Sequence, residues 1–203
     1  MLGPEEAREA HRELRLGIRY ERVELGGITR QWRAVRPVGD VYFGPMIRTA
    51  DWVTSPLVEK VLSGFEDPGF VSWLSALAGE ELTFLRPVTA YRMGQGDRLC
   101  LHDDMSDPDH AVSVAYNLTP EWREGWGGET LFGRVVDVTP LPTPADSPID
   151  LREWHIRDEQ RFPPQYNSMI VMRLDFEYAH GVAEVLVPQE RYALVGIYGR
   201  VWS

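Results

Sequence analysis

The pattern of apolar residues changes at Gly79, and this change limits the possible folds more than any other feature of the sequence. Before Gly79, apolar residues recur at helical spacing; after it, short runs rich in β-branched and aromatic residues are bounded by Gly, Pro, Asp and Asn. Helices grouped early and strands grouped late predict an α+β chain with a mainly antiparallel sheet or sandwich, because parallel strands would need interleaved helices. The predicted strands are Leu82 to Arg92, Arg98 to His102, Ala111 to Asn117, Glu129 to Val136, Ser168 to Leu174, Ala183 to Val187 and Tyr192 to Trp202.

Helices are expected in two regions before Gly79. Pro4 to Leu16 carries a thin apolar stripe among charged residues, which is typical of a solvated outer helix or of a frayed terminus. Leu57 to Ala78 has a stronger stripe that is broken at Asp67-Pro68-Gly69, so it predicts two helices. Residues 1–80 are therefore expected to supply mostly helical support to the strands of residues 82–202.

The stretch from Thr139 to Gln165 interrupts the strand pattern. It contains six prolines, Pro140, Pro142, Pro144, Pro148, Pro163 and Pro164. Proline cannot donate to a strand ladder, so we expect a Pro-rich loop excursion on the surface, either a functional lid or a disordered insert. Trp154, His155 and Arg157 are the residues within it that are best able to contact a substrate.

Length and charge limit the class of protein. At 203 residues the chain can bury roughly 70% of its unfolded surface in one core, so a single domain over residues 1–203 is expected. The net charge of −10 repels phosphate backbones and anionic lipid headgroups, so neither nucleic acid nor a membrane is an expected partner. Cys100 is the only cysteine, and the charged N-terminal segment does not resemble a signal peptide, which together favour the cytoplasm. The sequence leaves the oligomeric state open.

The segment that ends at Asp104 carries the first candidate site. On an extended strand, His102 and Asp104 project to the same side while Asp103 points away. This spacing puts an imidazole and a carboxylate within reach of one metal ion, although such pairs at strand ends are often solvated or turn-capping groups.

An octahedral iron site of this kind needs a further imidazole. Of the five histidines, His11, His110 and His155 lie in a charged segment, a polar turn and the Pro-rich excursion. His180 remains as the candidate, and we expect it to be the neighbour of His102 across a sandwich.

Arg191 is the candidate anion-binding residue. A period of two puts it on the face of Ala193, Val195 and Ile197, so its guanidinium is expected to point into an apolar interior. A buried unpaired cation is very costly, so the natural partner is a carboxylate from outside, held by paired hydrogen bonds. A structural ion pair with a distant Asp or Glu is the alternative. Iron ligands together with an inward carboxylate clamp suggest a keto-acid cosubstrate.

Several segments, taken in order, resemble the prolyl-hydroxylase-like iron(II)/2-oxoglutarate-dependent dioxygenases. They are Tyr91 to Asp104, Val114 to Trp122, Trp126 to Leu131 with its Gly-Gly-Glu, His180 to Val185, and Arg191 to Leu194. The resemblance covers about Leu82 to Trp202, and the ordered set is far more specific than any one segment.

The resemblance implies a double-stranded β-helix (jelly-roll) core over residues 82–202, with an N-terminal helical layer. It implies Fe2+ bound by His102, Asp104 and His180, 2-oxoglutarate bound by Arg191, O2 as the oxidant and ascorbate as an accessory. Tyr91 matches a position whose hydroxyl often reaches the cosubstrate, and packing of its ring inside the sheet is an equal alternative. Asp103 is the alternative carboxylate if the strand bulges there.

The activity implied by the resemblance is hydroxylation of an unactivated C–H bond, with release of succinate and CO2. The compact chain favours a small molecule such as an amino acid or a specialised-metabolite intermediate. The alternatives are prolyl-type hydroxylation of a protein or peptide, and a non-catalytic jelly-roll binding protein. The Thr139 to Gln165 stretch is expected to govern the choice of substrate rather than the metal chemistry.

Overall fold

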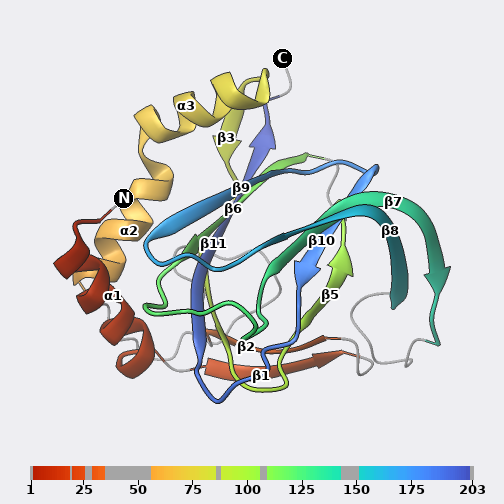
Figure 1. Cartoon of the computed structure of the whole chain (residues 1–203). Helices are drawn as coiled ribbons and strands as arrows, with labels where there is room; N and C mark the ends of the chain where they lie inside the picture. The colour runs from red at the N-terminus through yellow and green to blue at the C-terminus, as the bar shows by residue number, and fades with distance from the viewer. Residues whose placement is uncertain are drawn as a thin grey trace.

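Two antiparallel sheets and three helices make up the regular structure of the residues described by the computed structural model, which are 2–18, 20–25, 29–34, 56–85, 88–105, 109–142 and 151–201. The larger sheet has the order β1-β2-β4-β11-β6-β9, with β3 also paired to β11, and the smaller sheet has the order β5-β10-β7-β8 (Figure 1). The strands of the larger sheet are β1 (Tyr20–Leu25), β2 (Thr29–Ala34), β3 (Leu82–Phe84), β4 (Thr89–Met93), β6 (His110–Asn117), β9 (Ser168–Arg173) and β11 (Arg191–Arg200). Those of the smaller sheet are β5 (Leu99–His102), β7 (Thr130–Pro140), β8 (Arg152–Phe162) and β10 (Tyr178–Val182).

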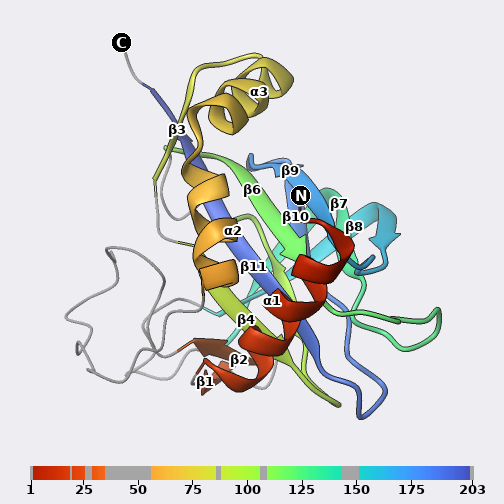
Figure 2. The same cartoon turned by 90° about the vertical axis from the view of Figure 1, so that its left-hand side faces the viewer.

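The helices α1 (Pro4–Leu16), α2 (Pro56–Glu66) and α3 (Pro68–Ala78) confirm the predicted helical regions. Asp67 caps α3, since its Oδ1 accepts a hydrogen bond from the Phe70 amide at 3.0 Å, and Gly79 ends the helix with a φ of +77°. The thin stripe of α1 is buried against α2 and β11, so this helix packs on the fold instead of fraying. Figure 2 shows α1 and α2 in front of the larger sheet. No helix in the described ranges combines the length and apolar character that crossing a membrane demands.

The larger sheet lies between the helices and the smaller sheet (Figure 1). Its helix face is apolar and shares one core cluster with the helices. The residues of this face on β6 and β11 include Val112, Val114, Tyr116, Tyr192 and Leu194. The opposite face, here called the inner face, carries the residues that alternate with these, namely Ser113, Ala115, Asn117, Arg191 and Ala193.

The first part of the chain is not only helical, as the sequence had suggested. β1 and β2 pair with each other, and β2 pairs with β4, so this hairpin extends the larger sheet. Two short runs separated by Gly26-Gly27 are a hairpin signal that the prediction of a helical layer missed. The reason is that charged residues are frequent in both runs, which resembles a solvated loop unless pairing is considered.

The predicted Pro-rich loop excursion is wrong for residues 152–162, which form the edge strand β8 along the whole length of β7. The prolines flank this strand instead of interrupting it, since Pro140 and Pro142 precede it and Pro163 and Pro164 follow it. Residues 143–150 lie outside the described residues. A role of the Thr139 to Gln165 stretch in substrate choice stays a prediction.

Two predicted strands differ most from the observed ones. The predicted strand Leu82 to Arg92 is divided into β3 and β4, with residues 86–87 outside the described residues, as is Trp202 at the other end. The apolar run Ala183 to Val187 is not a strand, because its backbone bonds to two turns, one at Gly96 and Asp97 and one around Gly127 and Gly128, and forms only an isolated bridge at Val185. The strand lies just before it, as β10.

Candidate active site

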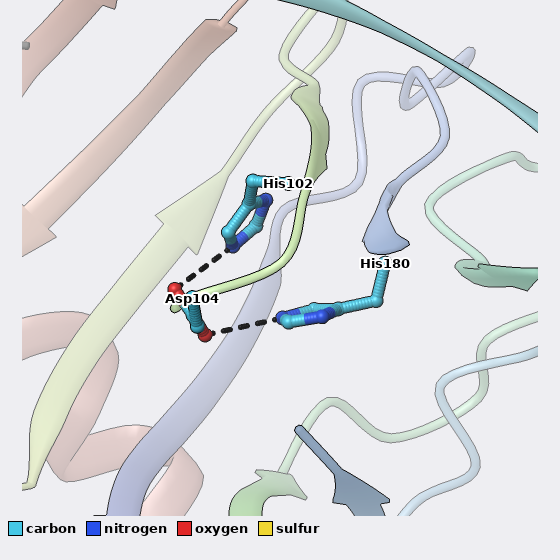
Figure 3. Close-up of side chains that lie close together, drawn as sticks. All are labelled: His102, Asp104 and His180. Atoms are coloured by element: carbon cyan, nitrogen blue, oxygen red, sulfur yellow. Dashed lines mark ion pairs between the residues drawn. The ribbon is translucent and has the colours of Figure 1, made fainter. Parts of the chain in front are cut away.

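Three side chains, two from the smaller sheet and one from the segment that follows β5, converge at one point (Figure 3). His102 is the last residue of β5, Asp104 follows it, and His180 lies in the middle of β10. Nε2 of His102 is 3.3 Å from Oδ1 of Asp104, and Nε2 of His180 is 3.2 Å from Oδ2. One donor atom from each residue lies within 4.8 Å of the others. The structure therefore brings together all of the predicted ligand-type residues.

The two histidines are direct neighbours in one sheet, not partners across a sandwich as predicted. His180 and His102 are opposite each other in the antiparallel pair of β10 and β5, and their ring centroids are 4.4 Å apart. Gly181 permits this close approach, because a Cβ at that position would lie 2.7 Å from the carbonyl oxygen of Leu99.

Asp104 reaches the site in a different way from the predicted strand alternation. β5 ends at His102, and Asp104 has a φ of +57°, in the left-handed region that Asp tolerates better than most residues. Asp103 does not join the cluster; its Oδ1 accepts a hydrogen bond from the Met105 amide at 3.0 Å. Asp104, not Asp103, is the carboxylate of the site.

Backbone contacts orient the imidazole of His102. Its Nδ1 lies 2.9 Å from the carbonyl oxygen of Cys100, and because a carbonyl can only accept, Nδ1 carries the proton. In the neutral imidazole with this tautomer, the lone pair of Nε2 is directed to the same point as the carboxylate. Such support from the backbone fixes a tautomer that suits metal binding.

The three groups interact strongly with one another. Burial opposes charge on His102, but the adjacent Asp104 outweighs it and raises the pKa of His102 to about 9. Burial and the charge of His102 lower the pKa of His180. For Asp104, burial acts in the opposite direction, yet the two imidazoles hold the pKa of this carboxyl well below its usual range. A carboxylate is therefore present at the centre of the cluster at neutral pH.

This donor set fits a divalent cation. Ligand atoms about 2.1 Å from a metal in adjacent octahedral positions lie about 3.0 Å apart. Here each imidazole lies 3.2–3.3 Å from a different oxygen of Asp104, and one donor atom of each residue lies within 4.8 Å of the others. Two imidazoles and one carboxylate on one side of an ion leave positions open for other ligands, an arrangement typical of non-haem iron oxygenases.

Arg191 points into the protein interior, as predicted from its period-two pattern. It is the first residue of β11 and only 4% exposed, and burial lowers its pKa to about 10. Nη2 donates to Oδ1 of Asn117 at 3.0 Å, and Nη1 lies 3.7 Å from Sδ of Met93. The carboxylate of Glu129 favours the positive charge of Arg191, although the described residues show no ion pair between the two side chains.

Asn117 is a site residue that the sequence analysis missed. It is fully buried on the inner face at the end of β6. The guanidinium of Arg191 can only donate, so the amide must turn Oδ1 toward it, which leaves Nδ2 with no acceptor among the described residues. Nε of Arg191 is also buried and has no acceptor among the described residues. Two buried donors without acceptors, on side chains that are hydrogen-bonded to each other, form an incomplete site for an anion with several acceptor oxygens.

The other residues predicted to contact cosubstrate or substrate lie at different distances from the site. Tyr91 lies on β4 opposite Ala193, on the same face as Arg191. Trp154 pairs with Val138, whereas the β7 residue opposite His180 is Phe132, so Trp154 is displaced along the strand by about 20 Å. His155, which pairs with Asp137, shares this displaced part of β8, whereas Arg157 pairs with Arg134, only two residues from Phe132. Both side chains are exposed.

The fold and the donor set together define the class of the protein, a non-haem iron oxygenase. Residues 88–199, more than half of the chain, match the family model of the 2OG-Fe(II) oxygenase superfamily. The chain belongs to this superfamily. It is a 2-oxoglutarate-dependent dioxygenase that uses Fe2+, 2-oxoglutarate and O2, so the predicted family, enzyme class and these cosubstrates are confirmed.

Solved structures show the same fold. An oxidoreductase of the 2OG-Fe(II) oxygenase family from Burkholderia pseudomallei aligns with a TM-score of 0.63 and 21% identity over 95% of this chain and 78% of its own. A prolyl hydroxylase from Trichoplax adhaerens, in complex with a hypoxia inducible factor peptide fragment, gives 0.61 and 17% over 98% and 80%. The epimerase SnoN from nogalamycin biosynthesis gives 0.59 and 14% over 98% and 75%. No curated protein matches the chain significantly. The predicted jelly-roll core with its helical layer is confirmed.

Proposed function

We propose that this dioxygenase hydroxylates an unactivated C–H bond of a small molecule, such as an amino acid or a specialised-metabolite intermediate. The observation that carries the proposal is the convergence of His102, Asp104 and His180 at the smaller sheet, which faces the inner face of the larger sheet that holds Arg191 (Figure 1). The helices share a buried core with the larger sheet, which supports one dioxygenase domain over the chain.

His102, Asp104 and His180 would hold Fe2+ through two Nε2 atoms and one carboxylate oxygen. When bound, Fe2+ with 2-oxoglutarate and O2 supplies the oxidation, in which the cosubstrate becomes succinate and CO2 and one oxygen atom enters the substrate. The contribution of the chain is to keep the ligands in fixed orientations. The hydrogen bond from His102 to Cys100 and the close packing at Gly181 do this.

Arg191 and Asn117 would hold the distal carboxylate of 2-oxoglutarate. Nε of Arg191 and Nδ2 of Asn117 are buried donors without acceptors among the described residues, and a carboxylate has acceptor oxygens for both. The contact from Oδ1 of Asn117 orients the guanidinium before the cosubstrate arrives. The role of Tyr91 is to add a hydroxyl contact from β4 on the same face.

Neighbours of this fold act on different kinds of substrate. SnoN takes part in nogalamycin biosynthesis, and the Trichoplax enzyme is found with a peptide fragment. Hydroxylation of a protein or peptide is therefore the second candidate.

A succinate-release screen tests the proposal. The Fe2+-loaded protein is incubated with 2-oxoglutarate, O2 and libraries of free amino acids, other small metabolites and proline-containing peptides. Product mass increased by one oxygen atom, in proportion to succinate, identifies the substrate. The matched control is the Asp104→Ala variant, which should release no succinate. Turnover only with peptides would replace the small-molecule proposal by the second candidate.

A further inference from the structure

We propose that His110 is a positioning residue of the metal site, which holds the backbone at Asp104 so that its carboxylate meets both imidazoles. This inference rests on the proposed role of Asp104 as a metal ligand. From the sequence, His110 was predicted to lie in a polar turn and was excluded as a metal ligand. In the structure it is instead a buried residue, 6% exposed, at the start of β6.

The contact itself is specific. Nδ1 of His110 lies 2.7 Å from the carbonyl oxygen of Asp104. A carbonyl oxygen only accepts, so His110 donates through Nδ1–H. Asp104 needs such support because it lies beyond the end of β5, with a φ of +57° that a residue with a Cβ disfavours.

His110 is itself held firmly. It pairs with Gly199 on β11, and its carbonyl oxygen accepts a hydrogen bond from Nη1 of Arg200 at 2.6 Å. Nε of Arg200 in turn lies 3.0 Å from Oε2 of Glu80. The backbone of His110 is therefore fixed to the larger sheet, while the backbone that its imidazole contacts belongs to the segment that follows β5 of the smaller sheet.

The consequence is a defined division of roles. His102 and His180 are set by strand pairing between β5 and β10, but Asp104 is not in a ladder. Without the contact from His110, the backbone at Asp104 is free to leave the left-handed region, and the carboxylate oxygens no longer point to both Nε2 atoms. Loss of His110 should then weaken metal binding although His110 does not touch the metal.

The experiment compares two amides. In His110→Asn, the side-chain Nδ2 takes the place of Nδ1 and can still donate to Asp104, whereas the longer side chain of His110→Gln moves the donor away. Fe2+ affinity is measured anaerobically by chelator competition, the ligand geometry by the absorption spectrum of the Co2+ protein, and folding by thermal unfolding. His11→Gln is the matched control, since His11 packs against Tyr192 on the helix face.

We expect Fe2+ affinity to fall about tenfold or more in His110→Gln, in line with the usual effect of residues that support metal ligands. His110→Asn and His11→Gln should stay close to the wild type, and only His110→Gln should change the Co2+ spectrum. Wild-type affinity in both His110 variants would overturn this inference alone, as would equal loss in both. A wild-type protein that binds no Fe2+, or an Asp104→Ala variant that binds it equally well, would overturn the proposed function and this inference with it.

Discussion

The two faces of the larger sheet are built from the same strands but from different kinds of residue. Along β6, large apolar side chains point to the helices, and small or polar ones alternate with them on the inner face. β11 repeats the pattern, with Tyr192 and Leu194 on the helix face and Arg191 and Ala193 on the inner face. Every one of these residues is buried, so burial alone does not distinguish them.

The residues of the helix face therefore contribute mainly to folding, and the residues of the inner face mainly to ligand binding. The helix face gains free energy by burying apolar area, roughly 25 cal/mol per Å². The inner face keeps a cation and an amide out of water with donors that the described residues leave without acceptors, which costs free energy unless a ligand completes them. Neighbouring positions on one strand should therefore give opposite results when they are changed.

The largest effect is expected when the metal ligands are removed. The double variant Asp104→Ala, His180→Ala keeps one of the three ligand-type residues, so its Fe2+ affinity should fall by about 100-fold or more, beyond the effect usual for supporting residues. Metal analysis after anaerobic reconstitution measures this, with the exposed His155→Ala as the control. The double variant should still unfold cooperatively. Undiminished Fe2+ binding would remove the basis of the site.

On the helix face, Leu194→Ala should lower the free energy of unfolding by about 2–5 kcal/mol, because this fully buried side chain would leave a cavity among the helices. Urea unfolding measures the loss. The affinity of the folded variant for 2-oxoglutarate should not change. Val136→Ala, at a position that is 56% exposed, is the control and should cost less than about 0.5 kcal/mol. A loss below 1 kcal/mol for Leu194→Ala would mean that the helix face is not the main apolar core.

On the inner face, Arg191→Ala should weaken 2-oxoglutarate binding more than tenfold and leave Fe2+ affinity unchanged. A charge-assisted contact is worth about 1.5–3 kcal/mol, and the metal ligands are not touched. Without 2-oxoglutarate, Arg191→Ala should lose less free energy of unfolding than Leu194→Ala, since the truncation also removes a buried cation whose Nε has no acceptor among the described residues.

Titration of 2-oxoglutarate against the metal-to-ligand absorption band measures the affinity. Arg134→Ala is the control, because that side chain is 47% exposed and pairs with Glu177. Asn117→Ala should give a smaller loss than Arg191→Ala. Equal affinity in Arg191→Ala and the wild type would assign the distal carboxylate to another basic residue.

The sequence predicted the parts of the site that local patterns carry. His102, Asp104, His180 and Arg191 stand in segments with a characteristic order, and the period-two pattern of β11 correctly placed Arg191 in the interior. Asn117 was missed, although it continues the small and polar alternation of Ser113 and Ala115. The signal is visible only when the two faces of β6 are compared, because the whole strand is buried.

Features that depend on pairing between distant segments could not be predicted in the same way. The left-handed turn at Asp104 and its contact with His110 have no signal in strand alternation. The edge strand β8 was not predicted, because the prolines on either side of it indicated a loop. The strand predicted near β10 was assigned to the more apolar run that follows it. In each case the partner strand determines the structure, and propensity within the segment does not identify that partner.

The smallest effect is expected at Tyr91, where the comparison of faces can still separate two roles of one side chain. Tyr91 lies opposite Ala193 on the inner face, beside the strand of Arg191. Because its hydroxyl is proposed to contact the cosubstrate, Tyr91→Phe should weaken 2-oxoglutarate binding by about two- to tenfold, the range for one neutral hydrogen bond, without lowering the temperature of unfolding. If the ring only packs in the sheet, Phe preserves the packing and the affinity stays the same.

Titration with 2-oxovalerate, which lacks the distal carboxylate, shows which end of the cosubstrate the hydroxyl contacts. A loss seen with 2-oxoglutarate but not with 2-oxovalerate places the hydroxyl at the distal carboxylate, near Arg191. A loss with both ligands places it nearer the keto end, and no loss with either assigns Tyr91 to packing alone.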